Sequence, residues 1–385
     1  MRWMATETAV ISRRALMKGL GGIAAMAALA PDHSAFAGSL LDADALDAPL
    51  FASARREADG SYAIVLADDA GFELAKVALP DRGHGLAVSP DRRKIMAFAR
   101  RPGTFALLID PFENRAPQLI ASEPGRHFYG HGCFSPDGRL VYAVENDFEA
   151  ARGVVGVYDV SGLEVRRLGE LDTNGIGPHD ILLDRDSRTL VIANGGIETH
   201  PGRPREKLNL DTMTPSVVFI DRKTGDLKAS HALPAELHQL SLRHMAQDGA
   251  GRIWVGGQYE GALTETPPLV TRLGRDDAPK LFEVPGRLKS ALNNYIGSVV
   301  ASSDGDVIAT SAPRGNRVLF WRADDGAFLG AQSVTDGCGV APLDRKAFLI
   351  SDGTGGMSYL PGVDGPLEVL ARPAGVAWDN HLFPV

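Results

Sequence analysis

The stretch Gly83–Asp91, GHGLAVSPD, decides the fold class, because it recurs as GHGCFSPDG at Gly130–Gly138. Looser copies follow, so that the marked positions are residues 84, 131, 179, 244, 296, 338 and 381, spaced 42 to 65 residues apart. In the clearest copies the marked position is followed by a Ser-Pro-Asp turn and then by an apolar strand such as Leu140–Val144. Further strand-like segments complete each repeat. Four short strands in about 45 residues are typical of one blade of a β-propeller. The sequence therefore predicts an all-β fold, a seven-bladed β-propeller.

The two ends of the chain are expected to close the ring together. Three strand-like segments precede the first mark, at Leu50–Arg55, Tyr62–Ala67 and Phe72–Leu79, whereas only one strand's length of chain follows Val376. The C-terminal strand would then be the innermost strand of a blade whose outer three strands are N-terminal, which leaves no exposed terminal edge. Eight blades is the competing interpretation, but no unassigned segment is long enough for another blade.

Composition agrees with a turn-rich globular domain and excludes several other classes. The 385 residues are 44% hydrophobic and include 43 Gly and 24 Pro, which favours short strands and turns over long helices. With 40 basic and 48 acidic residues, a net charge of -8 and no basic tract, the chain is a poor partner for nucleic acid or an anionic membrane. Its two cysteines form no CxxC pair, which excludes a disulfide framework and a cysteine-based zinc site.

The N-terminus is typical of a twin-arginine export signal. Arg13 and Arg14 precede a small-residue apolar run over Gly19–Ala30, and Ala35-Phe36-Ala37 offers a signal-peptidase site. The run is too short for a membrane span. We therefore expect a cleaved signal peptide at residues 1–37, a linker at 38–49, the propeller at 50–385, and a periplasmic location.

The marked positions are the candidate functional site, because strand polarity within a blade places them on one face around the central channel. An insertion at Gly195–Thr214 lies on that same face. Imidazole and thiolate are ligands that copper, iron and zinc favour, and a propeller axis can bring them together from different blades. The predicted metal ligands are His84, His131, His179, His244, Cys338 and His381.

The spacing of these residues leaves other interpretations open. His131 and His244 lie eight residues before an arginine, whereas His84 and His179 lie nine residues before an arginine. A shift of one residue along a strand can turn a side chain away from the channel. Structural lining of the channel and acid–base catalysis are the alternatives to a metal or cofactor. His127 is either a further ligand or an exposed loop residue, and Cys133 is expected to be a buried small hydrophobe.

Several motifs together resemble a family of uncharacterised bacterial proteins. They are Ser12-Arg13-Arg14, Gly177-Pro178-His179-Asp180, Gly195–Pro201 with Lys207–Leu210, Leu240–His244, and Tyr295–Ser298. Members of this family resemble the quinoprotein amine dehydrogenase β-chain in fold, with WD40/YVTN-like repeats, and are exported by the twin-arginine route. The resemblance implies an association with imelysin-type and di-haem-type proteins of periplasmic iron uptake, but it supplies no catalytic residues.

Two classes of function follow from these patterns. The first is a periplasmic protein that binds a transition metal, or a partner protein, through the histidine-lined face, in iron acquisition. The second is a metal-dependent enzyme: an oxidoreductase, or a lactonase-like hydrolase in which Glu145 and Asn194 would help to hold Ca²⁺. The excess of histidine over carboxylate favours a transition metal. No GxSxG, HExxH or P-loop motif is present, and no nucleophile–base pair has a recognisable spacing.

Overall fold

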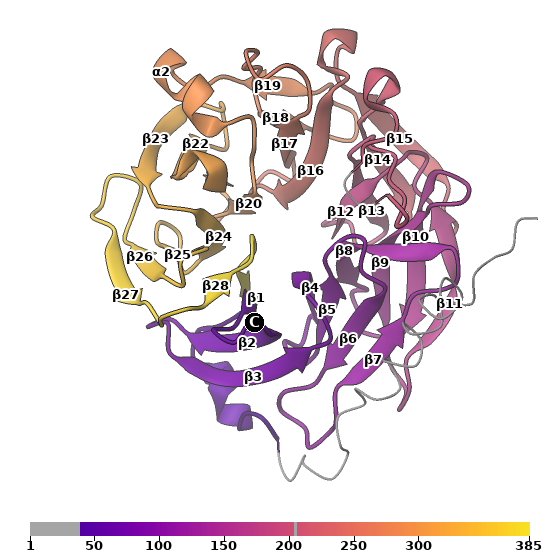
Figure 1. The fold of residues 1–385 in the computed structure, drawn as a ribbon, viewed down its shortest axis with the longest axis vertical. Coiled ribbons are helices and arrows are strands. Elements are labelled where there is room, and N and C mark those ends of the chain that lie inside the picture. Colours follow the sequence, from indigo (N-terminus) through magenta and orange to yellow (C-terminus); the bar gives the residue numbers. More distant parts are fainter. Residues whose placement is uncertain (1–38, 204–205) are drawn as a thin grey trace, which may run out of the picture. The chain divides into compact units, whose positions relative to one another are not determined.

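A computed structural model describes residues 39–203 and 206–385, so the predicted signal peptide lies outside the described residues. In this part of the chain the strands form seven sheets arranged in a ring (Figure 1). The predicted all-β, seven-bladed propeller is confirmed. Each sheet is antiparallel throughout, as expected of blades built from consecutive short strands.

The first four blades follow the chain from Leu50 to Ala232. Blade 1 contains β1 (Leu50–Arg56), β2 (Tyr62–Asp68) and β3 (Glu73–Leu79) with β28 (Ala377–Trp378) and β29 (Phe383–Pro384). Blade 2 contains β4 (Gly83–Val88), β5 (Ile95–Ala99), β6 (Phe105–Ile109) and β7 (Gln118–Ala121). Blade 3 contains β8 (Arg126–Phe134), β9 (Leu140–Asp147), β10 (Arg152–Asp159) and β11 (Arg166–Asp172). Blade 4 contains β12 (Pro178–Leu183), β13 (Thr189–Asn194), β14 (Ser216–Asp221) and β15 (Leu227–Ala232).

The last three blades complete the ring. Blade 5 contains β16 (Leu240–Gln247), β17 (Ile253–Tyr259), β18 (Val270–Leu273) and β19 (Lys280–Phe282). Blade 6 contains β20 (Ser298–Ala301), β21 (Val307–Ala312), β22 (Arg317–Arg322) and β23 (Phe328–Ser333). Blade 7 contains β24 (Gly337–Pro342), β25 (Phe348–Asp352), β26 (Met357–Leu360) and β27 (Glu368–Ala371). The short helical segments are η1 (Ala43–Asp47), η2 (Leu210–Thr212), η3 (Ala235–Leu237), α2 (Gly286–Lys289), η4 (Ser290–Leu292) and η5 (Pro313–Gly315).

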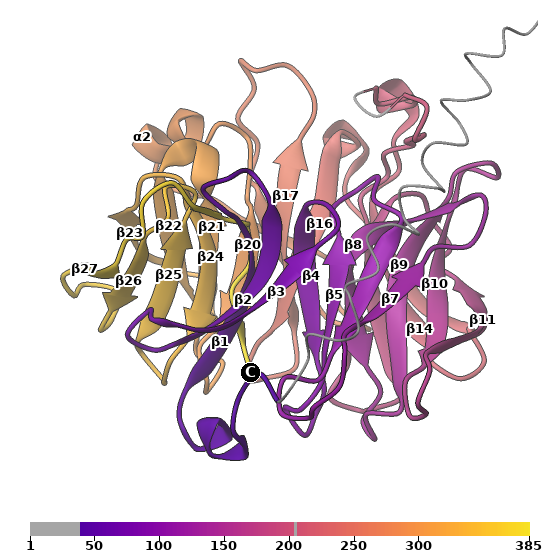
Figure 2. The same cartoon turned by 60° about the horizontal axis from the view of Figure 1, so that its bottom comes forward.

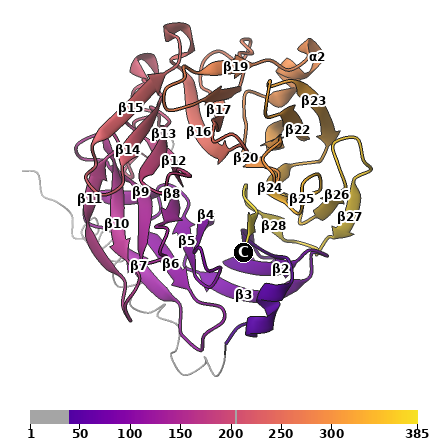
Figure 3. The same ribbon diagram turned by 180° about the vertical axis from the view of Figure 1, so that it is seen from behind.

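The ring is closed by the C-terminal segment, as its sequence predicts. Both β28 and β29 pair with β1 and so form the innermost part of blade 1. The chain between them carries His381, whose carbonyl accepts a hydrogen bond of 2.5 Å from the Ser53 hydroxyl of β1. The end of the chain lies at the ring, beside β1 and β2 (Figures 1 and 3).

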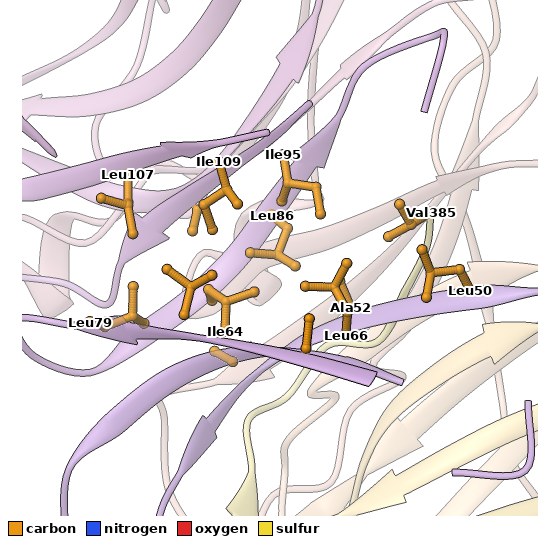
Figure 4. Packing of buried hydrophobic residues seen from close by; sticks show 14 of the residues in the cluster. Leu50, Ala52, Ile64, Leu66, Leu79, Leu86, Ile95, Leu107, Ile109 and Val385 are labelled. Carbon is orange, nitrogen blue, oxygen red and sulfur yellow. The ribbon is translucent and has the colours of Figure 1, made fainter. Parts of the chain in front are cut away.

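Side chains from adjacent blades pack against each other and hold the ring together. Between blades 1 and 2, Leu66 and Ile64 of β2 lie in the same apolar cluster as Leu86 and Ile95 of blade 2 (Figure 4). The C-terminal Val385 joins this cluster, and so do Leu40 and other apolar residues of the segment before β1. Residues 39–49 therefore pack on the propeller through η1, which lies at one end of the ring (Figure 2).

The predicted insertion is present between β13 and β14 and contains η2. The Asn146 side chain donates to the Thr199 carbonyl at 3.0 Å, which fastens the insertion to blade 3. Within the insertion, the Asn209 side chain bonds the Glu198 amide and the Gly196 carbonyl. No helix in the described residues is long and apolar enough to cross a membrane.

Candidate metal centre

Five histidines from five blades meet on the axis of the propeller. They are His84 on β4, His131 on β8, His179 on β12, His244 on β16 and His381 between β28 and β29. Nine pairs of these rings have centroids between 4.5 and 6.0 Å apart. Four of the five are buried, and His179 is half-buried. The structure therefore brings together all five histidines that the sequence predicts as ligands.

A break in strand register explains why the uneven spacing does not turn any histidine away. The pairing of the innermost strand with its neighbour shifts between Gly83 and Leu86, between Phe128 and Gly132, between Pro178 and Asp180, and between Leu242 and Met245. Each irregular segment contains the histidine of its blade. Bulges bend a strand and re-aim a side chain, so the histidines can face the axis in spite of spacings that differ by one residue.

Two glycines of the repeated GHG motif make room for the rings. A Cβ atom on Gly85 would lie 2.7 Å from His131 Nδ1, and one on Gly130 would lie 2.7 Å from His84 Cδ2. Gly130 also has a φ of 109°, which a residue with a side chain rarely adopts. The motif thus lets imidazoles from adjacent blades approach each other closely.

Four ring nitrogens in this cluster are buried and have no hydrogen-bond partner among the described residues. They are Nε2 of His131, His179 and His381, and Nδ1 of His244. Buried polar atoms in folded proteins are nearly always paired, since an unpaired one costs free energy. Two histidine triads, one of His84, His131 and His179 and the other of His84, His244 and His381, have potential ligand atoms within 4.8 Å of one another. In a tetrahedral zinc site each nitrogen is about 2.0–2.1 Å from the ion, so that the nitrogens lie about 3.3 Å from one another; the rings of a triad would therefore move closer together to hold an ion.

The histidines are held in the neutral form that ligates a metal. Burial lowers the pKa of His84 to about 3, although the hydrogen bond with Asp379 opposes the shift. Burial above all lowers the pKa of His179, His244 and His381 well below the ordinary value, with smaller contributions from Arg243 at His179 and from neighbouring histidines at all three. Burial also lowers the pKa of His131. Neutral imidazole has a free lone pair, which protonated imidazole lacks.

Two buried carboxylates orient these rings. Asp379 Oδ1 accepts from His84 Nδ1 at 2.8 Å, and its other oxygen binds Arg82 at 2.6 Å. Burial raises the pKa of Asp379, but His84 and the charges of Arg100 and Arg82 overcome this and lower it, so the carboxylate stays ionised. A carboxylate on Nδ1 leaves Nε2 of His84 free to ligate, an arrangement common behind metal-bound histidines. Asp180 Oδ1 lies 3.4 Å from His131 Nδ1 in a similar position.

The marked positions 296 and 338 do not contribute to the cluster. The Cys338 thiol is buried and donates to the Asp336 carbonyl at 3.0 Å, in a separate cavity that Arg82 and Asp379 also line. Ile296 packs in the apolar core of blades 5 and 6. Its neighbour Ser298 approaches the axis instead, with Oγ 3.4 Å from His381 Nδ1.

Other candidates from the sequence have structural roles. His127 is buried, bonded through Nδ1 to the Phe128 carbonyl at 2.9 Å and through Nε2 to Asn146 at 3.0 Å, so it is neither a ligand nor an exposed loop residue. The Glu145 carboxylate is occupied by Tyr158 and Arg167, and Asn194 bonds the Thr173 carbonyl. Within the described part of the chain, the groups that could hold a metal consist only of histidines, which disfavours the calcium site.

A cavity of about 490 Å³ lies in the channel beside the cluster. His131, His244 and His381 line it together with apolar side chains of the innermost strands, such as Val88 and Phe383. Cys133 also lines it and is half-buried, although the sequence led us to expect a buried residue. Burial raises the pKa of the Cys133 thiol, so it stays protonated and is a poor metal ligand.

Sequence reasoning missed the residues that support the cluster, above all Asp379, Asp180 and Ser298. Each aspartate lies within two residues of a marked histidine, in Pro178-His179-Asp180 and in Asp379-Asn380-His381. An acidic residue close to a marked histidine was therefore the feature of the sequence that could have indicated them. Each, however, serves a histidine of another blade: Asp180 lies by His131, and Asp379 by His84. Only the closed ring reveals these pairings.

Seven antiparallel blades around a histidine-lined axis define the class of the protein, a β-propeller with a candidate metal centre. The chain belongs to the DUF1513 family, described as proteins of unknown function, whose model matches residues 77–385. The expected membership of an uncharacterised propeller family is thus confirmed at the level of family and fold. Among curated proteins, none matches the chain in sequence.

Solved structures similar to this chain are propellers of distant sequence. A chain of Kuenenia stuttgartiensis hydrazine synthase has a TM-score of 0.54 and 17% identity, covering 83% of this chain and 94% of its own. The β-propeller domain of Myceliophteria thermophila Cps50 (Swd1) has a TM-score of 0.54 and 12% identity, covering 87% and 93%. At such identities the similarity shows the fold alone.

Proposed function

We propose that this propeller binds one transition-metal ion at the histidine cluster. The observation that carries the proposal is the set of four buried ring nitrogens that have no protein partner among the described residues, on rings held neutral by burial. If the rings only lined the channel, these nitrogens would have to be paired by water, whereas one ion can ligate several of them together. Nitrogen ligands suit copper, zinc and iron, and disfavour Ca²⁺ and Mg²⁺, which bind oxygen.

The cluster favours a metal over direct docking of a protein. The rings of His84, His131, His244 and His381 are only 2–6% exposed, so a partner protein could not contact them without rearrangement. A partner could still bind the loops around the channel.

We propose the location and the physiological role on the basis of the sequence. The protein is exported by the twin-arginine pathway to the periplasm and handles the metal there, in iron acquisition with imelysin-type or di-haem-type proteins. The support is the export signal and the family resemblance, together with a ligand set that accepts iron as well as copper and zinc.

Metal titration of single variants tests the proposal. The purified protein, stripped with a chelator, is titrated with Co²⁺, Cu²⁺ or Zn²⁺ in competition with an indicator. Each His→Ala change at positions 84, 131, 179, 244 and 381 should weaken binding by roughly tenfold or more, since even loss of a residue behind a ligand costs about 10–100-fold. The matched control is His127→Ala, because His127 is equally buried but bonded within blade 3. Affinities equal to the wild type in all five variants would refute the site.

A metal-dependent oxidoreductase is the second candidate, and the cavity of about 490 Å³ favours it. Three of the five histidines line this space, so a small molecule could reach the metal from there. Reduction or oxidation of the bound metal by a soluble electron carrier, followed by spectroscopy, would test this candidate. A bound metal that does not change oxidation state would leave binding as the function.

A further inference from the structure

The cavity of about 490 Å³ runs along the channel from the histidine cluster to one end of the ring. Three histidines of the cluster line it, and so does the last residue of every innermost strand, from Val88 of β4 to Pro384 of β29. Pro90 and Pro384 in its wall are exposed, so the cavity opens to solvent there. We call this the turn end of the channel, because the Ser-Pro-Asp turns follow the innermost strands at this end.

The insertion lies at the opposite end of the channel, where the innermost strands begin. Asn194, directly before the insertion, pairs with Pro178, the first residue of β12. The last residue of β12, Leu183, lines the cavity instead. The insertion and the cavity are therefore at opposite ends of the histidine cluster, and we call the end with the insertion the insertion end.

Arginine side chains lie on the insertion side of the cluster. Arg82 and Arg100 approach one carboxylate, Asp379, at 2.6 and 3.5 Å. The same carboxylate accepts from His84. A second cavity, of about 220 Å³, lies beside Asp379 and has Arg82 and two further arginines in its wall but no histidine. Because like charges repel each other, a metal ion is disfavoured on this side of the cluster.

The wall of the larger cavity suits a cation in water. Each innermost strand pairs with a neighbour on one side only, so its other edge, with free N–H and C=O groups, faces the channel (Figure 1). Backbone carbonyls can replace part of the hydration shell of a cation. No arginine or lysine is among the residues that line this cavity, and Asp180 is the one carboxylic acid among them. An ion with about six waters needs roughly 180 Å³, at about 30 Å³ per water, so the cavity has room for it.

We propose that the metal ion enters and leaves the histidine cluster through this cavity, as a hydrated divalent cation, from the turn end. The inference rests on the proposed metal site and adds the route by which that site is filled and emptied. The histidines in the wall of the cavity take the ion over from water and carbonyl oxygens while the ring stays closed. A protein that exchanges metal with this propeller then acts at the turn end and not at the insertion end.

The rates of cobalt exchange test the route, since the visible spectrum of bound Co²⁺ follows its loading and removal. The metal-free protein is mixed rapidly with CoCl₂, and the loaded protein with excess EDTA. Ala301→Phe adds a phenyl ring at the half-buried last residue of β20, in the wall of the cavity, and should slow both rates by about tenfold or more. The dissociation constant should stay within about twofold of the wild type, because an obstacle on the route affects entry and exit equally.

The matched control is Ala377→Phe. Ala377 of β28 is also half-buried and lines the second cavity, beside the arginines. The same phenyl ring there should leave both rates unchanged, because the ion does not pass this cavity. Thermal unfolding shows whether each variant is folded.

A second pair of variants tests the charge of the route and does not depend on how Ala301→Phe folds. Leu183→Lys adds a positive charge to the wall of the cavity at the end of β12. It should load cobalt more slowly than Leu183→Gln by about threefold or more, since the glutamine adds a polar group without the charge. The difference should shrink at high ionic strength.

The outcomes separate this inference from the metal proposal. Cobalt bound at one equivalent, with the same loading and removal rates in Ala301→Phe as in the wild type, would overturn the route and leave the metal site standing. Exchange at least as slow in Ala377→Phe as in Ala301→Phe would also overturn it, and so would equal loading rates of Leu183→Lys and Leu183→Gln at low ionic strength. If Ala301→Phe does not fold, the Leu183 pair decides. If the wild type binds no cobalt, the metal proposal fails and the route fails with it.

Discussion

Replacing Asp379 by Asn is a sharp test of how the cluster is organised. Asp379 does not belong to either histidine triad, but it holds His84 through a hydrogen bond of 2.8 Å. Asn has nearly the same shape and can still accept from His84 Nδ1 through its amide oxygen, so the variant removes the negative charge and leaves the geometry. Arg82 loses its partner but is 46% exposed and can turn to solvent. We therefore expect a folded protein with weaker metal binding.

The expected loss follows from the place of Asp379 behind His84. Loss of a carboxylate behind a metal-bound histidine lowers metal affinity by about 10–100-fold. This corresponds to about 1.4–2.8 kcal/mol, at about 1.4 kcal/mol for each factor of ten. The neutral amide makes His84 a weaker donor to the metal and less well fixed in orientation, and both effects act in the same direction.

The matched control is Asp352→Asn. Asp352 is equally buried and binds an arginine, Arg372, at 3.0 Å, but it contacts no histidine of the cluster. Competition titration with an indicator gives the metal affinity of both variants, and thermal unfolding shows whether each is folded. Asp379→Asn should bind metal less tightly than Asp352→Asn by tenfold or more. Equal affinities in the two variants would refute the role of Asp379.

Three further predictions concern closure, pH and export. Deleting residues 376–385 should unfold the whole domain, because Trp378, Leu382 and Val385 are at most 5% exposed and contribute about 1.5–3 kcal/mol each, comparable with the stability of a domain; an unchanged melting temperature would contradict the closure. In the metal-free protein the cluster histidines have a lowered pKa, about 3 for His84, so below pH 6.5 the unfolded chain binds more protons than the folded one. The free energy of unfolding should thus fall as the pH drops from 6.5, by up to about 1.4 kcal/mol per pH unit for each histidine that stays neutral; a flat profile in denaturant titrations between pH 7 and 5 would argue against neutral rings. Changing Arg13 and Arg14 together to Lys should leave the precursor in the cytoplasm, and periplasmic accumulation of that variant in cell fractionation would show that the export signal was misread.

The fold could be predicted from the sequence because each blade repeats one local pattern. The GHG and Ser-Pro-Asp copies at residues 83–91 and 130–138 fix the order of the innermost strand and its turn. The three strand-like segments before His84 and the single one after Val376 predict how the ends share blade 1, and the pairing of β28 and β29 with β1 confirms it. These features follow from the order and the number of the strands along the chain, so the sequence alone can predict them.

The site was predictable only in part, because its geometry depends on bulges and on contacts between blades. The repeat identified His84, His131, His179, His244 and His381, but it also placed Cys338 at an equivalent position, and in the structure the thiol bonds the Asp336 carbonyl instead. Spacing alone could not show that irregular register lets all five rings converge. The contacts of Asp379 with His84 and of Asp180 with His131 join segments far apart in the chain, so no local pattern indicates them.

Elemental analysis of the protein purified from its native compartment tests the central claim most directly. The wild type should carry about one equivalent of copper, iron or zinc after gel filtration. The quadruple variant His84→Ala, His131→Ala, His179→Ala and His244→Ala should fold, because these rings pack in the channel and not in the apolar core between blades, and it should carry no stoichiometric metal. Equal metal content in the two proteins, or none in the wild type even after incubation with each metal, would contradict the account.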